Sequence, residues 1–211
     1  MTQRFLAAFV IPAILAALLS GCGRTAMTRF YSLSPIPAAE TAPGDLRPLG
    51  GKAVGIGPVD LPDYLDRPQI VIRTSPHELR LAEFDKWAGT LKNAVPQVIA
   101  ENLAVLLGSD QVFTFPWKSG LPIHYQVIID IQRFDAQMGS HVDLQALWTV
   151  FENDGRKPLS TRKSTIRKPL AGADYAAVVQ AESLAIAALS GEIAAALADI
   201  DRPQGHRTPH P

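Results

Sequence analysis

The sequence is poor in cysteine and has no excess of charge of either sign. A single cysteine, Cys22, occurs among 211 residues, so no disulfide can form within one chain. Lysine and arginine number 20, aspartate and glutamate also number 20, and this balance gives no support to a nucleic-acid partner. The 47% of hydrophobic and 19% of charged residues are typical of one globular domain rather than of a disordered or fibrous chain.

The N-terminus has the layout of an export signal. Arg4 precedes the apolar run Phe5–Leu19, whose 15 residues are fewer than the about 20 that a membrane-spanning helix needs. The small residues Ser20 and Gly21 then supply a cleavage site. We therefore predict a signal peptide over residues 1–21 and not a permanent transmembrane anchor.

The lone cysteine follows Leu19-Ser20-Gly21 directly, and this stretch resembles the lipobox of bacterial lipoproteins. The resemblance implies cleavage before Cys22, a diacylglyceryl thioether on its sulfur and acylation of the new amino group with a fatty acid such as palmitate. Cysteine suits this role because a thiolate is a strong nucleophile. Gly23 stands where an aspartate would favour retention at the inner membrane, so outer-membrane localisation is expected. The alternative is an ordinary secretory signal with a stray or structural thiol.

Hydrophobic periodicity predicts one α+β domain. Apolar residues recur at helical spacing over Thr90–Leu107, a helix that Gly108 ends, and again from Tyr175 to Leu197, with Asp174 near the cap. Alternating patterns predict short strands at residues 29–35, 52–62, 69–74, 78–84, 111–117, 124–134, 142–151 and 158–168, the last of them a polar edge strand. We expect an antiparallel sheet of about four to six strands with the two amphipathic helices packed on one face.

Turn and breaker residues divide the chain into four parts. These are a signal peptide (1–21), a lipidated N-terminus with a short strand and a Pro/Gly-rich linker (22–51), an α+β lipoprotein domain (52–201) and a disordered tail (202–211). Gly55 and Gly57 lie inside a predicted strand, where glycine indicates close approach of another part of the chain.

No pattern of reactive residues points to catalysis. The five histidines lack metal-ligand spacing, and no Gly-x-Ser-x-Gly elbow occurs. Asp130 and Asp135 lie five residues apart on a predicted strand, which would place them on opposite faces of the sheet. We therefore expect no enzyme activity, no metal and no cofactor.

Two features are candidates for partner binding. Tyr64, Leu65 and Arg67 precede Pro68 in a proline-bracketed turn, which either caps the sheet or presents a rigid loop to a partner. Trp87 precedes the first helix and belongs either to the core or to an interface.

Several motifs carry a resemblance to a known family. They are FYSL, VDLPDYLDRPQIVIR, FDKWAG, AENLAVLLGSDQVFTFPW and YQVIIDIQRFD, within residues 30–135. They are similar to those of the PqiC-type membrane-integrity-associated transporter subunits, also described as ABC-type transport auxiliary lipoproteins. The resemblance implies an outer-membrane lipoprotein facing the periplasm, which works with an MCE-domain protein and an integral inner-membrane component to move lipids between the membranes. It implies no catalytic residue.

Three non-enzymatic functions are compatible with this sequence. In the first, the domain is a tethered scaffold that docks the MCE-domain partner. In the second, it is a carrier that holds a lipid tail between sheet and helices, although the alanine-rich last helix favours close packing there. The third is a stand-alone envelope-integrity lipoprotein. Exposed sheet edges make a homo-oligomer a further expectation.

Overall fold

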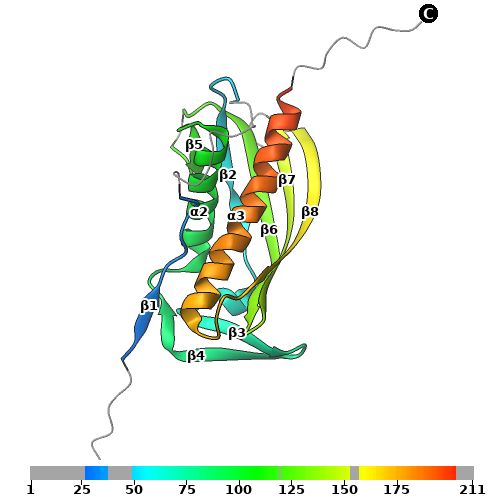
Figure 1. Cartoon of the computed structure of the whole chain (residues 1–211). Helices are drawn as coiled ribbons and strands as arrows, with labels where there is room; N and C mark the ends of the chain where they lie inside the picture. Colours follow the sequence, from blue (N-terminus) through cyan, green and yellow to red (C-terminus); the bar gives the residue numbers. More distant parts are fainter. Residues whose placement is uncertain (1–26, 38–48, 119, 153–156, 203–211) are drawn as a thin grey trace, which may run out of the picture.

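A single sheet and two α-helices account for most of the residues that the computed structural model describes, namely 27–37, 49–118, 120–152 and 157–202 (Figure 1). The signal peptide, Cys22, most of the predicted linker and most of the C-terminal tail lie outside these ranges. In chain order the elements are β1 (Arg29–Tyr31), β2 (Ala53–Asp60), the 3-10 helix η1 (Asp63–Leu65), β3 (Gln69–Ser75), β4 (Glu78–Trp87), α2 (Leu91–Leu107), β5 (Val112–Thr114), β6 (Ile123–Gln137), β7 (His141–Glu152), β8 (Lys157–Pro169) and α3 (Tyr175–Ile200).

The sheet is mixed and has eight strands, which corrects the expected antiparallel sheet of about four to six. The strand order is β1-β4-β3-β6-β2-β5, and β7 and β8 extend the sheet from β6. β2 runs parallel to both β5 and β6, and β1 runs parallel to β4. Parallel neighbours need a long crossover connection, and α2 lies within the one that joins β2 to β5 and β6. Hairpin signals are local, whereas parallel pairing leaves no local signal, so the sequence pattern favoured an antiparallel sheet.

The meander of β6, β7 and β8 is antiparallel and confirms three predicted strands. Val127 and Ile129 of β6 and Leu144 and Trp148 of β7 are at most 1% exposed, so the alternating apolar residues face the core. Among the described strands β8 pairs only with β7, which makes it the polar edge strand that its composition predicts.

A register shift after Ile131 interrupts the alternation of β6. Asp130 therefore pairs with Leu147 of β7, and Asp135 pairs with Asp143 of β7. Because Leu147 and Asp143 are four positions apart, they lie on the same face of the sheet, and so do the two β6 aspartates that pair with them. The expectation that the two aspartates face opposite sides is wrong. Four residues of strand still separate them by ~13 Å, so they do not form a carboxylate pair.

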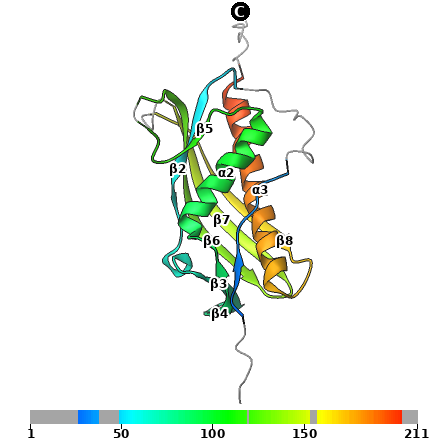
Figure 2. The ribbon, with the colours of Figure 1, turned by 90° about the vertical axis from the view of Figure 1, so that its left-hand side faces the viewer.

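Both helices pack on one face of the sheet, as expected (Figure 2). α2 ends at Gly108, whose φ of 58° is the left-handed conformation that glycine favours. α3 begins after Asp174, whose carboxylate accepts a 2.8 Å hydrogen bond from the backbone N–H of Ala177. α3 is long and apolar enough to cross a membrane, but half of its most apolar window is buried within the fold. It packs as a core helix that keeps an apolar outer face.

The two glycines of β2 allow the close approach that the sequence predicts. A Cβ atom at Gly55 would lie 2.7 Å from a ring carbon of Trp117, so the indole packs directly on the strand backbone. Gly57 has a φ of 117°, and a Cβ atom there would lie 2.9 Å from the Cβ of Phe115. The rings of Phe115 and Trp117 meet edge to face, with centroids 5.3 Å apart, and cover this end of the sheet.

Candidate functional site

The loop formed by residues 62–68, here called the proline loop, is held by its own backbone. Leu65 N–H donates to Pro62 O at 2.9 Å, and Arg67 N–H donates to Leu65 O at 2.8 Å. The Leu65 side chain is only 4% exposed and anchors the loop in the core. The loop is therefore preorganised, which lowers the entropy cost of binding a partner.

Tyr64 fixes the proline loop to β6. Its hydroxyl donates to Asp135 at 3.0 Å and accepts a hydrogen bond from the N–H of Phe134 at 3.3 Å. Burial raises the pKa of Tyr64 to about 12, so its hydroxyl stays protonated and remains a donor at neutral pH. Tyr64 thus has a structural contact that uses both its donor and its acceptor capacity.

Asp135 is the centre of a cluster of charged side chains. Its carboxylate accepts hydrogen bonds from Arg73 at 2.8 and 2.9 Å and from Arg133 at 3.1 and 3.2 Å. Burial opposes ionisation of Asp135, but the donors Arg73, Arg133 and Tyr64 outweigh it and lower its pKa. Arg133 also contacts Asp143 at 3.1 Å, which extends the cluster to β7.

The five residues proposed from the sequence for partner binding differ in accessibility. Trp87 is 5% exposed and, like Leu65, belongs to the core, and its backbone N–H donates to Pro68 O at 2.7 Å. Arg67 is half-buried, and its Nε has no hydrogen-bond partner among the described residues. The structure describes no ion pair between Arg67 and either of the aspartates in the loop. Arg67 and exposed Pro68 are therefore the members of the set that remain available to a partner.

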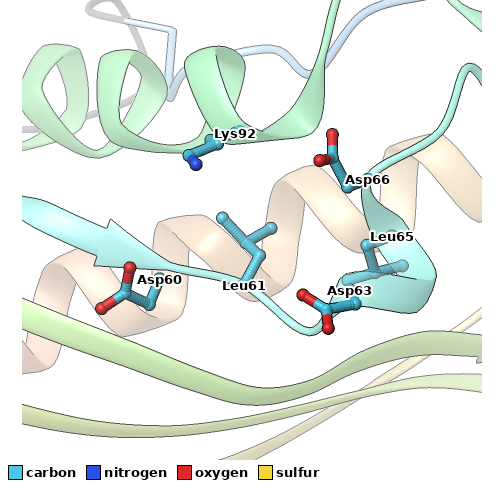
Figure 3. Close-up of a pocket in the computed structure, with 6 residues that line it drawn as sticks. All are labelled: Asp60, Leu61, Asp63, Leu65, Asp66 and Lys92. Atoms are coloured by element: carbon cyan, nitrogen blue, oxygen red, sulfur yellow. The ribbon is translucent and has the colours of Figure 1, made fainter.

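A small acidic pocket lies beside this loop (Figure 3). Its volume is about 150 Å³, and Leu61 and Leu65 form its apolar part. Three carboxylates, Asp60, Asp63 and Asp66, surround it together with Lys92 of α2. No group of three metal-ligating side chains that could hold an ion occurs in the ranges that the structure describes. The excess of negative charge suits a basic side chain from a partner.

Residues 32–37 form a strap across the helix layer that the sequence did not predict (Figure 2). Ser34 N–H donates to Ser183 Oγ of α3 at 3.1 Å, and Ile36 N–H donates to Asn102 Oδ1 of α2 at 2.7 Å. Asn102 is fully buried and also donates to Ser190 Oγ of α3 at 3.2 Å, so one amide joins both helices to the strap. The sequence feature that could have indicated the strap is the presence of a polar residue on the buried face of each helix, Asn102 and Ser190.

A groove runs between the strap and the N-terminal half of α3, and it is called here the helix groove. Its volume is about 530 Å³, and its walls are mostly apolar. The residues that line it are Tyr31, Ser34, Pro35, Ile36, Pro37, Ala176, Val179, Gln180, Ser183, Leu184 and Ala187. Leu184 is 51% exposed and adds apolar surface that is open to water beside the groove.

The fold and this site describe a small α+β domain with a rigid loop and an apolar groove at its surface. The sequence model of the ABC-type transport auxiliary lipoprotein component matches residues 31–194. The chain therefore belongs to this family of lipoproteins, which are auxiliary parts of transport systems and not a known class of enzymes.

Solved structures share the fold at low sequence identity. A Xanthomonas campestris protein of the DUF330 family has a TM-score of 0.69 and 17% identity, covering 82% of this chain and 96% of its own. An uncharacterised protein has a TM-score of 0.66 and 17% identity, covering 82% of this chain and 99% of its own. No curated protein matches the sequence. These likenesses support the fold alone.

Proposed function

We propose that this chain is a PqiC-type subunit, an outer-membrane lipoprotein that faces the periplasm and docks an MCE-domain protein. The complex, completed by an inner-membrane component, would move lipids between the two membranes. Family membership supports the auxiliary role in transport. The MCE partner and the outer membrane follow from the motif resemblance and from Gly23 after the lipobox cysteine.

The observation that carries the docking role is the rigid, acidic proline loop. Its backbone is internally hydrogen-bonded, and Tyr64 and Leu65 hold it against the sheet. Arg67, Pro68 and the carboxylates of Asp63 and Asp66 remain at the surface. A preformed loop of this kind gives a partner a fixed charge pattern.

The proposed anchor would set the orientation of the domain. Arg29, where β1 begins, lies seven residues after Cys22, and an extended chain of that length spans at most ~25 Å. The end of the sheet formed by β1 and β4 would therefore stay close to the membrane. Replacing Cys22 with serine is expected to release the protein from the membrane fraction.

Photo-crosslinking tests the docking role. We would place benzoylphenylalanine at Asp66 of the full-length lipoprotein, in cells that also make an MCE-domain protein. Exposed Asp110, which follows α2 at its other end, is the matched control position. A crosslink to the MCE-domain protein from position 66 alone is expected.

Charge reversal supplies the second arm of the test. The double variant Asp60→Lys and Asp63→Lys, made in the protein that carries benzoylphenylalanine at position 66, should reduce the crosslink by roughly tenfold, because like charges oppose a basic partner. Equal crosslinking from both positions, or none, would refute docking through this loop. Barrier function that persists without the MCE-domain protein would favour the stand-alone envelope-integrity role.

A further inference from the structure

The helix groove has a chemistry that neither loop docking nor anchoring uses. Its floor consists of aliphatic side chains of α3, including Val179, Leu184 and Ala187, and Ile36 of the strap forms part of its wall. A volume of about 530 Å³ is within the range of small-molecule sites, about 300–1,000 Å³. Apolar surface left open to water in this way costs free energy that a bound apolar group would recover.

The hydrogen-bonding groups described below are already paired within the protein, which favours a ligand that needs no hydrogen bonds. Ser183 Oγ accepts from Ser34 N–H and donates to Val179 O at 2.8 Å, so this hydroxyl is already paired. The strap N–H of Ile36 is likewise engaged by Asn102. An extended peptide would find few backbone partners here, whereas a hydrocarbon chain requires none.

A cation lies at the end of the groove that Tyr31 lines. The Tyr31 hydroxyl donates to Asp85 Oδ1 at 2.9 Å, and Arg29 contacts the same carboxylate through Nε at 2.8 Å and Nη2 at 3.2 Å. The side chain of Arg29 is 62% exposed. A guanidinium has five N–H donors, and two nitrogens contact Asp85, so donors remain for an anionic group.

The groove is also within reach of the membrane under the proposed function. Tyr31 lies nine residues after Cys22, and a chain of that length spans at most ~32 Å. The lipid nearest to this groove is therefore the lipid of the bilayer in which the protein is anchored.

We propose that the helix groove binds one acyl chain of a membrane phospholipid, with the phosphate of its headgroup at Arg29. This inference rests on the proposed lipid transport function and names the ligand and its site. The lipid lies on the outer side of the helix layer. This differs from the carrier hypothesis, which placed it between sheet and helices, where fully buried residues such as Ile193, Trp148 and Val150 fill the core.

The test uses the full-length lipoprotein reconstituted in vesicles of phosphatidylethanolamine and phosphatidylglycerol. Benzoylphenylalanine replaces Leu184 in the groove or, as the matched control, Leu147 on the helix-free face of the sheet, which is 39% exposed. After irradiation, mass spectrometry identifies the adducts. A phospholipid adduct is expected at position 184 and not at position 147.

Two changes test the two ends of the ligand. Ala187→Trp fills the groove and should lower the lipid adduct roughly tenfold, which corresponds to ~1.4 kcal/mol. Ala195→Trp, two turns further along the same helix and outside the groove lining, should leave it unchanged. Replacing Arg29 with glutamine removes the cation that would hold the headgroup phosphate and should reduce the adduct.

The outcomes separate this inference from the proposed function. No lipid adduct at position 184, equal adducts at both positions, or an adduct to protein alone, whether a second copy or residues of the same chain, would overturn the groove inference. If Ala187→Trp loses the lipid adduct while the crosslink from position 66 is intact, the result supports both lipid binding in the helix groove and docking through the proline loop. Absence of the position-66 crosslink with lipid adducts retained refutes only the docking role.

Discussion

Glu182 gives the sharpest prediction about stability, because it is an acidic residue in the apolar core. Its side chain lies on the buried face of α3, and Glu182 is 2% exposed. Oε2 has no hydrogen-bond partner among the described residues. Burial, reinforced by the negative charge of Asp135, raises the pKa of Glu182 well above its usual value.

The sign of the pH dependence follows from this shift. Below the pKa of the unfolded chain, about 4.3, the carboxyl is protonated in both states and has no effect. Above that value the native state holds a proton that the unfolded state has released. The free energy of unfolding therefore falls by about 1.4 kcal/mol per pH unit until the pH reaches the native pKa of Glu182.

The Glu182→Gln variant removes this dependence, because glutamine has nearly the same shape and no charge. The difference in unfolding free energy, variant minus wild type, should rise by about 1.4 kcal/mol per pH unit above about pH 5 and then reach a plateau. For a chain of this size, each step of about 1.4 kcal/mol corresponds to about 3–6 °C in Tm. The pKa of the Asp135 carboxylate is lowered, so its protonation changes stability in the opposite direction and at lower pH. It therefore does not affect the pH range in which Glu182 acts.

Urea unfolding between pH 4.5 and pH 8, followed by tryptophan fluorescence, measures the difference. Contributions that are common to the wild type and the variant cancel when the two curves are subtracted. Glu101→Gln, at an exposed position of α2, is the matched control and should give a flat difference. Parallel curves for wild type and Glu182→Gln would refute the reasoning.

Four further substitutions test other parts of the fold by urea unfolding. Gly55→Ala places a Cβ 2.7 Å from the Trp117 ring and should cost about 1–3 kcal/mol, whereas Gly191→Ala on α3, where no atom lies within 4 Å of the new Cβ, should stabilise by about 0.5–1 kcal/mol. Asp135→Asn leaves Arg73 and Arg133 without their anionic partner and should cost about 3 kcal/mol at pH 7. The cost should shrink as the pH falls below about 4, because the unfolded wild-type chain takes up a proton there before the native state, whose Asp135 pKa is lowered. Asn102→Ala orphans Ile36 N–H and should cost about 1–3 kcal/mol, and hydrogen exchange at Ile36 should accelerate if the strap depends on that amide. An unchanged exchange rate at Ile36 would contradict this role of Asn102.

Local signals in the sequence explain which parts of the fold could be predicted. The helix ends at Gly108 and Asp174 are set by capping, and the core faces of β6 and β7 are set by alternation, so both could be read from short windows. The glycines of β2 indicated close approach without revealing that Trp117 was the neighbour. Capping and alternation depend on residues near one another in the chain, whereas the contact between Gly55 and Trp117 does not.

Long-range features could not be predicted in the same way. The parallel pairing of β2 with β6 depends on residues about 70 positions apart, and no local pattern encodes it. The register shift in β6 changed the face of Asp135, and its partner Arg73 comes from another hairpin. The strap depends on Asn102 and Ser190 meeting across two helices, which sequence spacing alone does not show. The candidate residues of the proline loop were identified, but the helix groove was not.

The way the chain enters the domain determines how it would carry a mechanical load. A pull on the residues before Met27 first reaches β1, which is held by its pairing with β4 and by the Arg29–Asp85 contact. The next resistance comes from the Ser34 and Ile36 hydrogen bonds on two different helices. Force from the N-terminal side is thus spread over several bonds in sequence, and the helix layer and the proline loop would keep their shape while the tether is under tension.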